Sequence, residues 1–92
     1  MKEITKGCFC ISRCGHDAGT LYYVVNVSDA AYVCDGVLKG VDNPKKKNPK
    51  HLQVLNYRDA ALQEKAMSQT LRNEDIKYAI KKLSALIKQE GN

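Results

Sequence analysis

Glycine and proline, the residues that most often end regular structure, are unevenly distributed along this chain of 92 residues. Apart from Gly91, all of them lie in the first 49 positions. Frequent turn residues favour short strands, whereas a long segment without them, rich in Ala, Leu, Lys, Gln and Glu, favours helices. This distribution predicts an α+β chain with a β-rich first half and a helical second half.

Apolar runs rich in β-branched and aromatic residues, typical of strands, occupy the first half. They cover residues 8–11, 21–27, 31–34, about 37–41 and 51–55. Asp35 and Gly36 between two of these runs predict a two-residue hairpin turn that needs a positive φ. Because closing five short strands removes their unpaired edges, we expect a small β-barrel within residues 1–56.

The second half, residues 57–92, carries the spacing of an amphipathic helix. One apolar stripe recurs at helical intervals: Ile76, Ala79, Ile80, Leu83 and Leu86/Ile87. Asn73 is placed to cap the start of this helix, and Glu74 and Asp75 suit the positive end of its dipole. A weaker stripe predicts an earlier helix over about 59–69. We expect this helical extension to pack on the barrel or on a partner.

The excess positive charge is confined to one short stretch. The whole chain has a net charge of +5. Residues 39–58 hold six basic residues against one acidic residue, whereas the flanking segments nearly balance. Asn43-Pro44 and Asn48-Pro49 bracket three consecutive lysines and predict an exposed basic loop there, since proline lacks a donor and restricts the residue before it. Such a loop could neutralise nucleic-acid phosphates.

One segment has the residue order of a known RNA-binding module. Gly7 is followed by alternating apolar residues, a Gly15–Gly19 loop (residues 12–19, SRCGHDAG) and the apolar run LYYVV at residues 21–25. This order resembles the KOW motif. The likeness extends through Asp35-Gly36 to the KKKNPKHLQ segment at residues 45–53. Over roughly residues 3–56 the chain is similar to short bacterial KOW-domain proteins related to a large-subunit ribosomal protein of archaeal and eukaryotic type.

The resemblance implies an SH3-like barrel that binds structured ribosomal RNA or a messenger leader, in association with the ribosome or its assembly. The RNA-contacting residues we expect are Arg13, Gly15, His16, Gly19, Lys39, Lys45, Lys46, Lys47, Lys50 and His51. The loop after Gly15 is often doubly basic in such proteins but reads His16-Asp17-Ala18-Gly19 here. This departure moves the expected phosphate contacts toward the lysine loop. We expect no enzymatic activity.

Tyrosines and cysteines offer further candidate sites. Tyr22 and Tyr23 are adjacent in a predicted strand and point to opposite faces, so at most one of them is free to stack on an unpaired base. Cys8, Cys10, Cys14 and Cys34 lack the paired spacing typical of zinc ligands, and we expect free thiols with no metal or other cofactor.

Two function classes remain open on the sequence. The first is RNA binding through lysine–phosphate contacts. The second is a protein-interaction module of a transcription or translation complex, because SH3-like barrels also bind polypeptides, including ribosomal proteins. No apolar run reaches the roughly 18 residues of a membrane helix, and residues 1–6 lack the apolar core of a signal peptide. We therefore expect a cytoplasmic protein that does not bind membranes.

Overall fold

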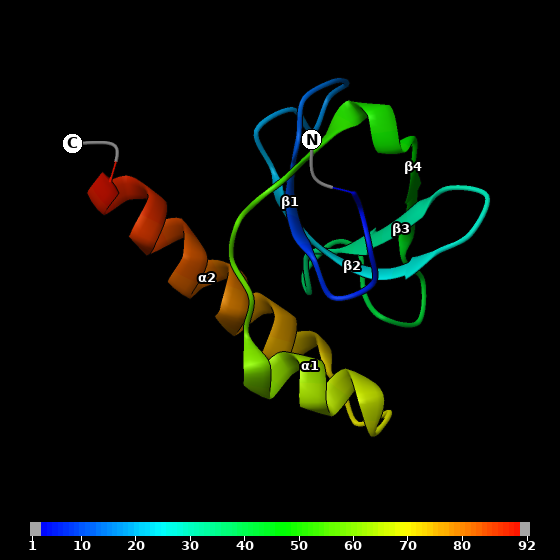
Figure 1. The fold of residues 1–92 in the computed structure, drawn as a ribbon, viewed down its shortest axis with the longest axis vertical. Coiled ribbons are helices and arrows are strands. Elements are labelled where there is room, and N and C mark those ends of the chain that lie inside the picture. Colours follow the sequence, from blue (N-terminus) through cyan, green and yellow to red (C-terminus); the bar gives the residue numbers. More distant parts are fainter. Residues whose placement is uncertain (1–2, 91–92) are drawn as a thin grey trace.

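A computed structural model describes residues 3–90 of the chain, and side chains up to residue 87. It shows an α+β fold in which a five-stranded antiparallel sheet is followed by two helices (Figure 1). The elements in chain order are β1 (Phe9–Ser12), β2 (Leu21–Val27), β3 (Ala31–Cys34), β4 (Lys45–Lys47), the 3₁₀ turn η1 (Pro49–His51), β5 (Leu52–Val54), α1 (Ala60–Met67) and α2 (Asn73–Glu90). The predicted division into a β half and a helical half is confirmed.

The strands are ordered β4-β3-β2-β1-β5 across the sheet. In the described residues β4 and β5 form the two outer edges and do not pair with each other, so the sheet is not closed into a barrel. Both helices lie on one side of the strands (Figure 1). None of the helices described is long and apolar enough to cross a bilayer.

Both faces of the sheet are buried, which the alternation of side chains along β2 makes clear. Tyr22 and Val24 belong to one apolar cluster, together with Cys10 and Val33. Tyr23 points to the opposite face. There it joins a second cluster, which combines Phe9 and Cys34 of the sheet with residues of both helices: Leu62, Ile76, Ala79 and Leu83. The helical extension therefore packs on its own sheet. The first part of the predicted α2 stripe, from Ile76 to Leu83, supplies this contact, whereas Leu86 and Ile87 at its end are exposed.

The predictions of a two-residue hairpin at Asp35-Gly36 and of a strand over residues 37–41 are wrong. The backbone N–H groups of Asp35 and Gly36 both donate to the carbonyl of Lys39 at 3.1 Å, and the Asp35 carboxylate accepts the N–H groups of Val37 and Lys39 at 2.9 Å. These bonds fold residues 35–39 into an irregular turn. The positive φ expected at Gly36 is present, at +80°.

The expected exposed lysine loop is also wrong, because residues 45–47 form β4. Ala31, Tyr32 and Val33 of β3 pair with Lys47, Lys46 and Lys45 respectively. The two prolines lie just outside the three paired residues, so the N–H groups needed for pairing remain available. The two prolines therefore limit the length of β4 but do not prevent the strand from forming.

The start of α1 supports a prediction on stability. The Asp59 carboxylate accepts the Leu62 N–H at 3.1 Å and lies 3.5 Å from Lys82 Nζ of α2. We expect Asp59→Ala to lower the free energy of unfolding by about 1 kcal/mol, through loss of the helix cap. Asp59→Asn keeps an oxygen that can accept the Leu62 N–H and should cost only a few tenths of that, since Lys82 is half-exposed. Urea unfolding measures both. Equal losses in the two variants would show that the ion pair, not the cap, stabilises this junction.

Candidate nucleic-acid interface

The loop between β1 and β2, residues 13–20, is held in a compact form by its own backbone. The N–H of Gly19 donates to the carbonyl of Ser12 at 2.8 Å, and the N–H of Thr20 donates to that of Asp17 at 2.9 Å. Gly15 and Gly19 have φ values of +88° and +91°. Such angles favour glycine over other residues, which explains why both ends of the turn carry it.

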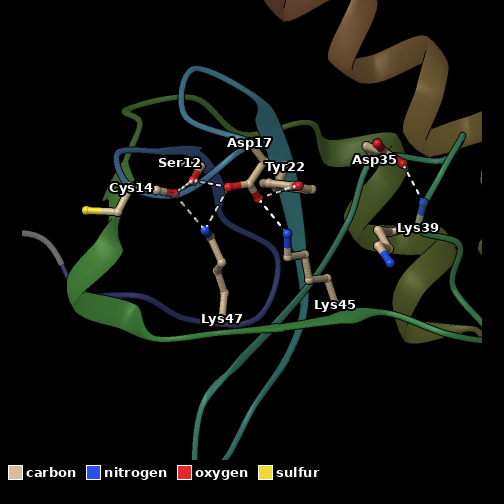
Figure 2. A network of polar contacts seen from close by, with 8 residues as sticks. All are labelled: Ser12, Cys14, Asp17, Tyr22, Asp35, Lys39, Lys45 and Lys47. Atoms are coloured by element: carbon tan, nitrogen blue, oxygen red, sulfur yellow. Dashed lines mark hydrogen bonds and ion pairs between the residues drawn. The ribbon is translucent and has the colours of Figure 1, made fainter.

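At the centre of this loop, the Asp17 carboxylate binds two lysines of β4 (Figure 2). Its Oδ1 lies 2.9 Å from Lys47 Nζ, and its Oδ2 lies 3.0 Å from Lys45 Nζ. The hydroxyls of Tyr22 and Ser12 donate to the same carboxylate at 2.7 Å and 3.0 Å. We call these five residues the Asp17 cluster. One carboxylate thus holds two cations and two hydroxyls.

The two lysines of the Asp17 cluster differ in their exposure. The side chain of Lys47 is only 9% exposed, and its Nζ also donates to the carbonyl of Cys14 at 3.1 Å. The side chain of Lys45 is 35% exposed. A buried ammonium group needs such partners, because removing it from water is costly. Lys47 is therefore a structural cation that ties β4 to the β1–β2 loop.

Opposing effects act on the pKa of Asp17. Burial raises this pKa by disfavouring the charged carboxylate, but the hydrogen bonds from Lys47, Tyr22, Lys45 and Ser12 outweigh burial and hold the pKa well below its usual range. Burial and the hydrogen bond to Asp17 raise the pKa of the Tyr22 hydroxyl. Neither group changes its charge near neutral pH.

Lys46, on the other face of β4, forms an exposed ion pair. Its Nζ lies 2.9 Å from the carboxylate of Asp29, and both side chains are more than half-exposed. Hydrogen bonds from Lys46, Tyr32 and Ser28 lower the pKa of Asp29 to about 2, and the same contact raises the pKa of Lys46. All three lysines of the predicted loop therefore have acidic partners within the chain.

Four other predicted residues gather at one end of the sheet without such partners. The N–H of Arg13 donates to the carbonyl of His51 at 2.8 Å, which joins the β1–β2 loop to η1. Arg13, His16, Lys50 and His51 are all exposed, and none forms an ion pair within the described residues. Arg13 also donates a hydrogen bond to Gln53. We call these four residues the basic end.

Lys39 is not part of this surface. It is the last residue of the 35–39 turn, where its N–H donates to the Asp35 carboxylate, and it lies away from the Asp17 cluster (Figure 2). The structure thus brings together the predicted residues of the β1–β2 loop, β4 and η1, and separates Lys39 from them.

Tyr22 and Tyr23 do not form a stacking platform on the sheet. Tyr22 and Tyr23 are both buried, so neither is free for a base, within the sequence-based limit of at most one. Tyr57 packs edge-on against Phe9, with ring centroids 5.3 Å apart. Tyr78 of α2 is 64% exposed, and Lys82 Nζ lies 4.9 Å from its ring centroid.

The four cysteines are free thiols, as expected. Cys8, Cys10 and Cys34 are buried, and Cys14 is exposed in the β1–β2 loop. Burial, followed by the effect of the neighbouring Cys8, raises the pKa of Cys10 to about 12. Burial and Asp35 raise the pKa of Cys34 to about 11. In the part of the chain that the structure describes, no three His, Cys, Asp or Glu side chains are grouped so as to hold a metal ion.

The role of Asp17 as the partner of two lysines was not predicted from the sequence. A signal was present, because Lys45 and Lys47 are two positions apart and would share one face of a strand. The prolines on either side argued for a loop and concealed that pattern. No protein-family model matches this chain, and a search of curated proteins found no match either. The KOW resemblance therefore stays a prediction based on the residues quoted for it.

Proposed function

We propose that this chain is a non-enzymatic RNA-binding protein of the KOW type, and that the basic end is its RNA-contacting surface. The observation that carries the proposal is the Arg13–His51 backbone hydrogen bond, which brings exposed cationic groups of two distant segments onto one surface. The positive charges of Arg13 and Lys50 have no acidic partner among the described residues and remain available to phosphates. The open five-stranded sheet with this loop is compatible with an SH3-like KOW fold.

The composition of the basic end favours recognition of RNA shape. Arginine, lysine and histidine side chains donate to phosphates and sugars, which position a protein on RNA without reading its sequence. The buried Tyr22 and Tyr23 offer no stacking surface for unpaired bases. The target we propose is therefore folded, base-paired RNA such as ribosomal RNA, met in the cytoplasm on the ribosome or during its assembly.

The Asp17 cluster has a supporting role in this proposal. It holds the β1–β2 loop against β4, so that Arg13 and His16 are presented in one arrangement. Lys45 and Lys47 stabilise the loop and contact RNA less than their position in a lysine run suggests. Neutralising them would test folding together with binding, so the decisive variants lie in the basic end.

We expect the double variant Arg13→Gln/Lys50→Gln to lower the slope of log affinity against log salt by about 2, because each lost phosphate contact removes about one released counterion. The measurement is a salt titration with a 20-base-pair RNA hairpin, chosen first as a generic folded RNA. Crosslinking in cells, followed by sequencing of the bound RNA, identifies the natural target for a second titration.

The matched control is Lys6→Gln/Arg72→Gln, which removes the same charge from residues outside the basic end. This control should keep the wild-type slope. Equal slopes for wild type and the Arg13→Gln/Lys50→Gln variant on the crosslinked RNA would contradict the proposal.

A further inference from the structure

A groove lies between the sheet and α2, at the opposite end of the β1–β2 loop from Arg13. It has a volume of about 740 Å³ and is lined by residues 19–21, by the 35–39 turn and by α2. Leu21, Val37, Ile80 and Ala85 supply its apolar lining. Val37 is 65% exposed, and the neighbouring Leu38 is 84% exposed. Val37 lines the groove, and together with the adjacent Leu38 it forms a small exposed aliphatic patch beside it.

The wall of this groove is held rigidly. A Cβ atom at Gly36 would lie 2.5 Å from the carbonyl oxygen of Asn73 and 2.8 Å from the nitrogen of Lys77, so the turn backbone packs directly on the start of α2. The Asn73 side chain does not cap its own helix as expected. Its Oδ1 accepts the N–H of Val41 at 2.8 Å and ties the far end of the turn to α2. Val37 is therefore displayed by a fixed backbone.

The charges beside the groove are predominantly positive. Lys77 and Lys81, one helical turn apart on α2, line it and are exposed. Neither forms an ion pair within residues 3–87, whereas Lys82 on the same helix binds Asp59. The one acidic residue of the lining, Asp35, already accepts two backbone N–H groups. The free ammonium groups of Lys77 and Lys81 thus lie beside the aliphatic lining of the groove.

We propose that this groove binds an acidic polypeptide segment whose aliphatic side chains contact Leu21, Val37 and Ile80, while its carboxylates pair with Lys77 and Lys81. The chemistry of the lining favours a polypeptide over RNA. Bases bind by stacking on aromatic rings or arginine planes, and no residue of either kind lines this groove. Aliphatic side chains flanked by lysines instead match the alternating apolar and acidic character of a peptide.

This site is distinct from the basic end, so the two proposals can fail separately. The first experiment selects peptides from a random 12-residue display library on the immobilised full-length protein. We expect enriched sequences that combine Asp or Glu with Leu, Ile, Val or Phe. A synthetic peptide of the enriched sequence should shift the backbone amide resonances of residues 19–21, 35–39 and 77–85.

The Lys77→Gln/Lys81→Gln variant should bind this peptide about tenfold more weakly, from the loss of two exposed ion pairs. The Lys6→Gln/Arg72→Gln variant, with the same change of charge outside the groove, should bind it as the wild type does. Three results would overturn the proposal: selection of no acidic–aliphatic sequence, equal affinity of the Lys77→Gln/Lys81→Gln variant, or peptide-induced shifts elsewhere. Displacement of the peptide by the 20-base-pair RNA hairpin, with matching shifts in the groove, would assign this surface to RNA instead.

Discussion

Replacing Asp17 by asparagine is expected to lower the free energy of unfolding by about 3–5 kcal/mol at pH 7, because it leaves a buried ammonium group without its charge partner. Lys47 is the critical group, since its side chain is 9% exposed and its remaining hydrogen bond goes to the Cys14 carbonyl. A neutral amide can accept a hydrogen bond but does not balance the charge. The loss would be measured by urea unfolding.

The effect of pH on the same pair has a definite sign. The pKa of Asp17 is lower in the folded protein than in the unfolded chain, where it is about 3.9. The stability that the ionised carboxylate contributes is therefore fully present above about pH 4 and is lost as pH falls through the folded pKa. Wild type should lose stability more steeply than Asp17→Asn below pH 4.

Two further variants test whether the loss of stability in Asp17→Asn comes from the unpaired charge of buried Lys47. Asp29→Asn removes an acid from a more exposed ion pair with Lys46 and should change stability little. Asp17→Asn combined with Lys47→Met removes both buried charges and should recover part of the lost stability. If Asp17→Asn were no more destabilising than Asp29→Asn, the structural role given to the Asp17 cluster would be wrong.

Gly36→Ala should be the second severe substitution, lowering the free energy of unfolding by about 2–5 kcal/mol. Part of this loss is backbone strain, because alanine rarely adopts the φ of +80° found here. The larger part is a clash, since the new Cβ would lie 2.5 Å from a backbone oxygen of α2 and force the turn away from the helix. A thermal melt should show a drop in Tm of about 10 °C or more.

Gly19→Ala is the matched control for this prediction. Gly19 has a similar φ of +91°, but a Cβ there would meet no atom within 4 Å. Only the strain, about 1–2 kcal/mol, should then be observed. Equal losses at the two glycines would show that the close packing of the 35–39 turn on α2 adds nothing to stability.

The close packing of Gly36 on α2 also affects the proposed groove. The turn that Gly36 brings close to α2 also displays Val37 at the rim. A partly destabilised Gly36→Ala protein, studied at low temperature where it stays folded, should bind the selected peptide more weakly. Gly19 itself lines the groove, so the control for this test is Gly15→Ala, which carries similar backbone strain outside the groove and should leave the Val37 wall in place.

The sequence by itself determined the features that depend on near neighbours. The loss of turn residues after Pro49 marked the change from strands to helices, and the apolar spacing of α2 identified the face that packs on the sheet. The positive φ at Gly36 also followed from local turn chemistry. Each of these rests on side-chain periodicity or on the backbone freedom of a single residue, which are properties of a short segment.

Only the tertiary structure decided which lysines of the described residues form ion pairs within the protein and which remain free on its surface. Lys45 and Lys47 bind an aspartate 28 and 30 positions away, and that contact exists because β4 pairs with β3 and so lies beside the β1–β2 loop. The exposed charges of Arg13 and Lys50 are brought onto one surface by the hydrogen bond between Arg13 and His51, which spans 38 positions. A charge count along the chain cannot separate bound from available cations, since the strength of an ion pair depends on distance and burial in space.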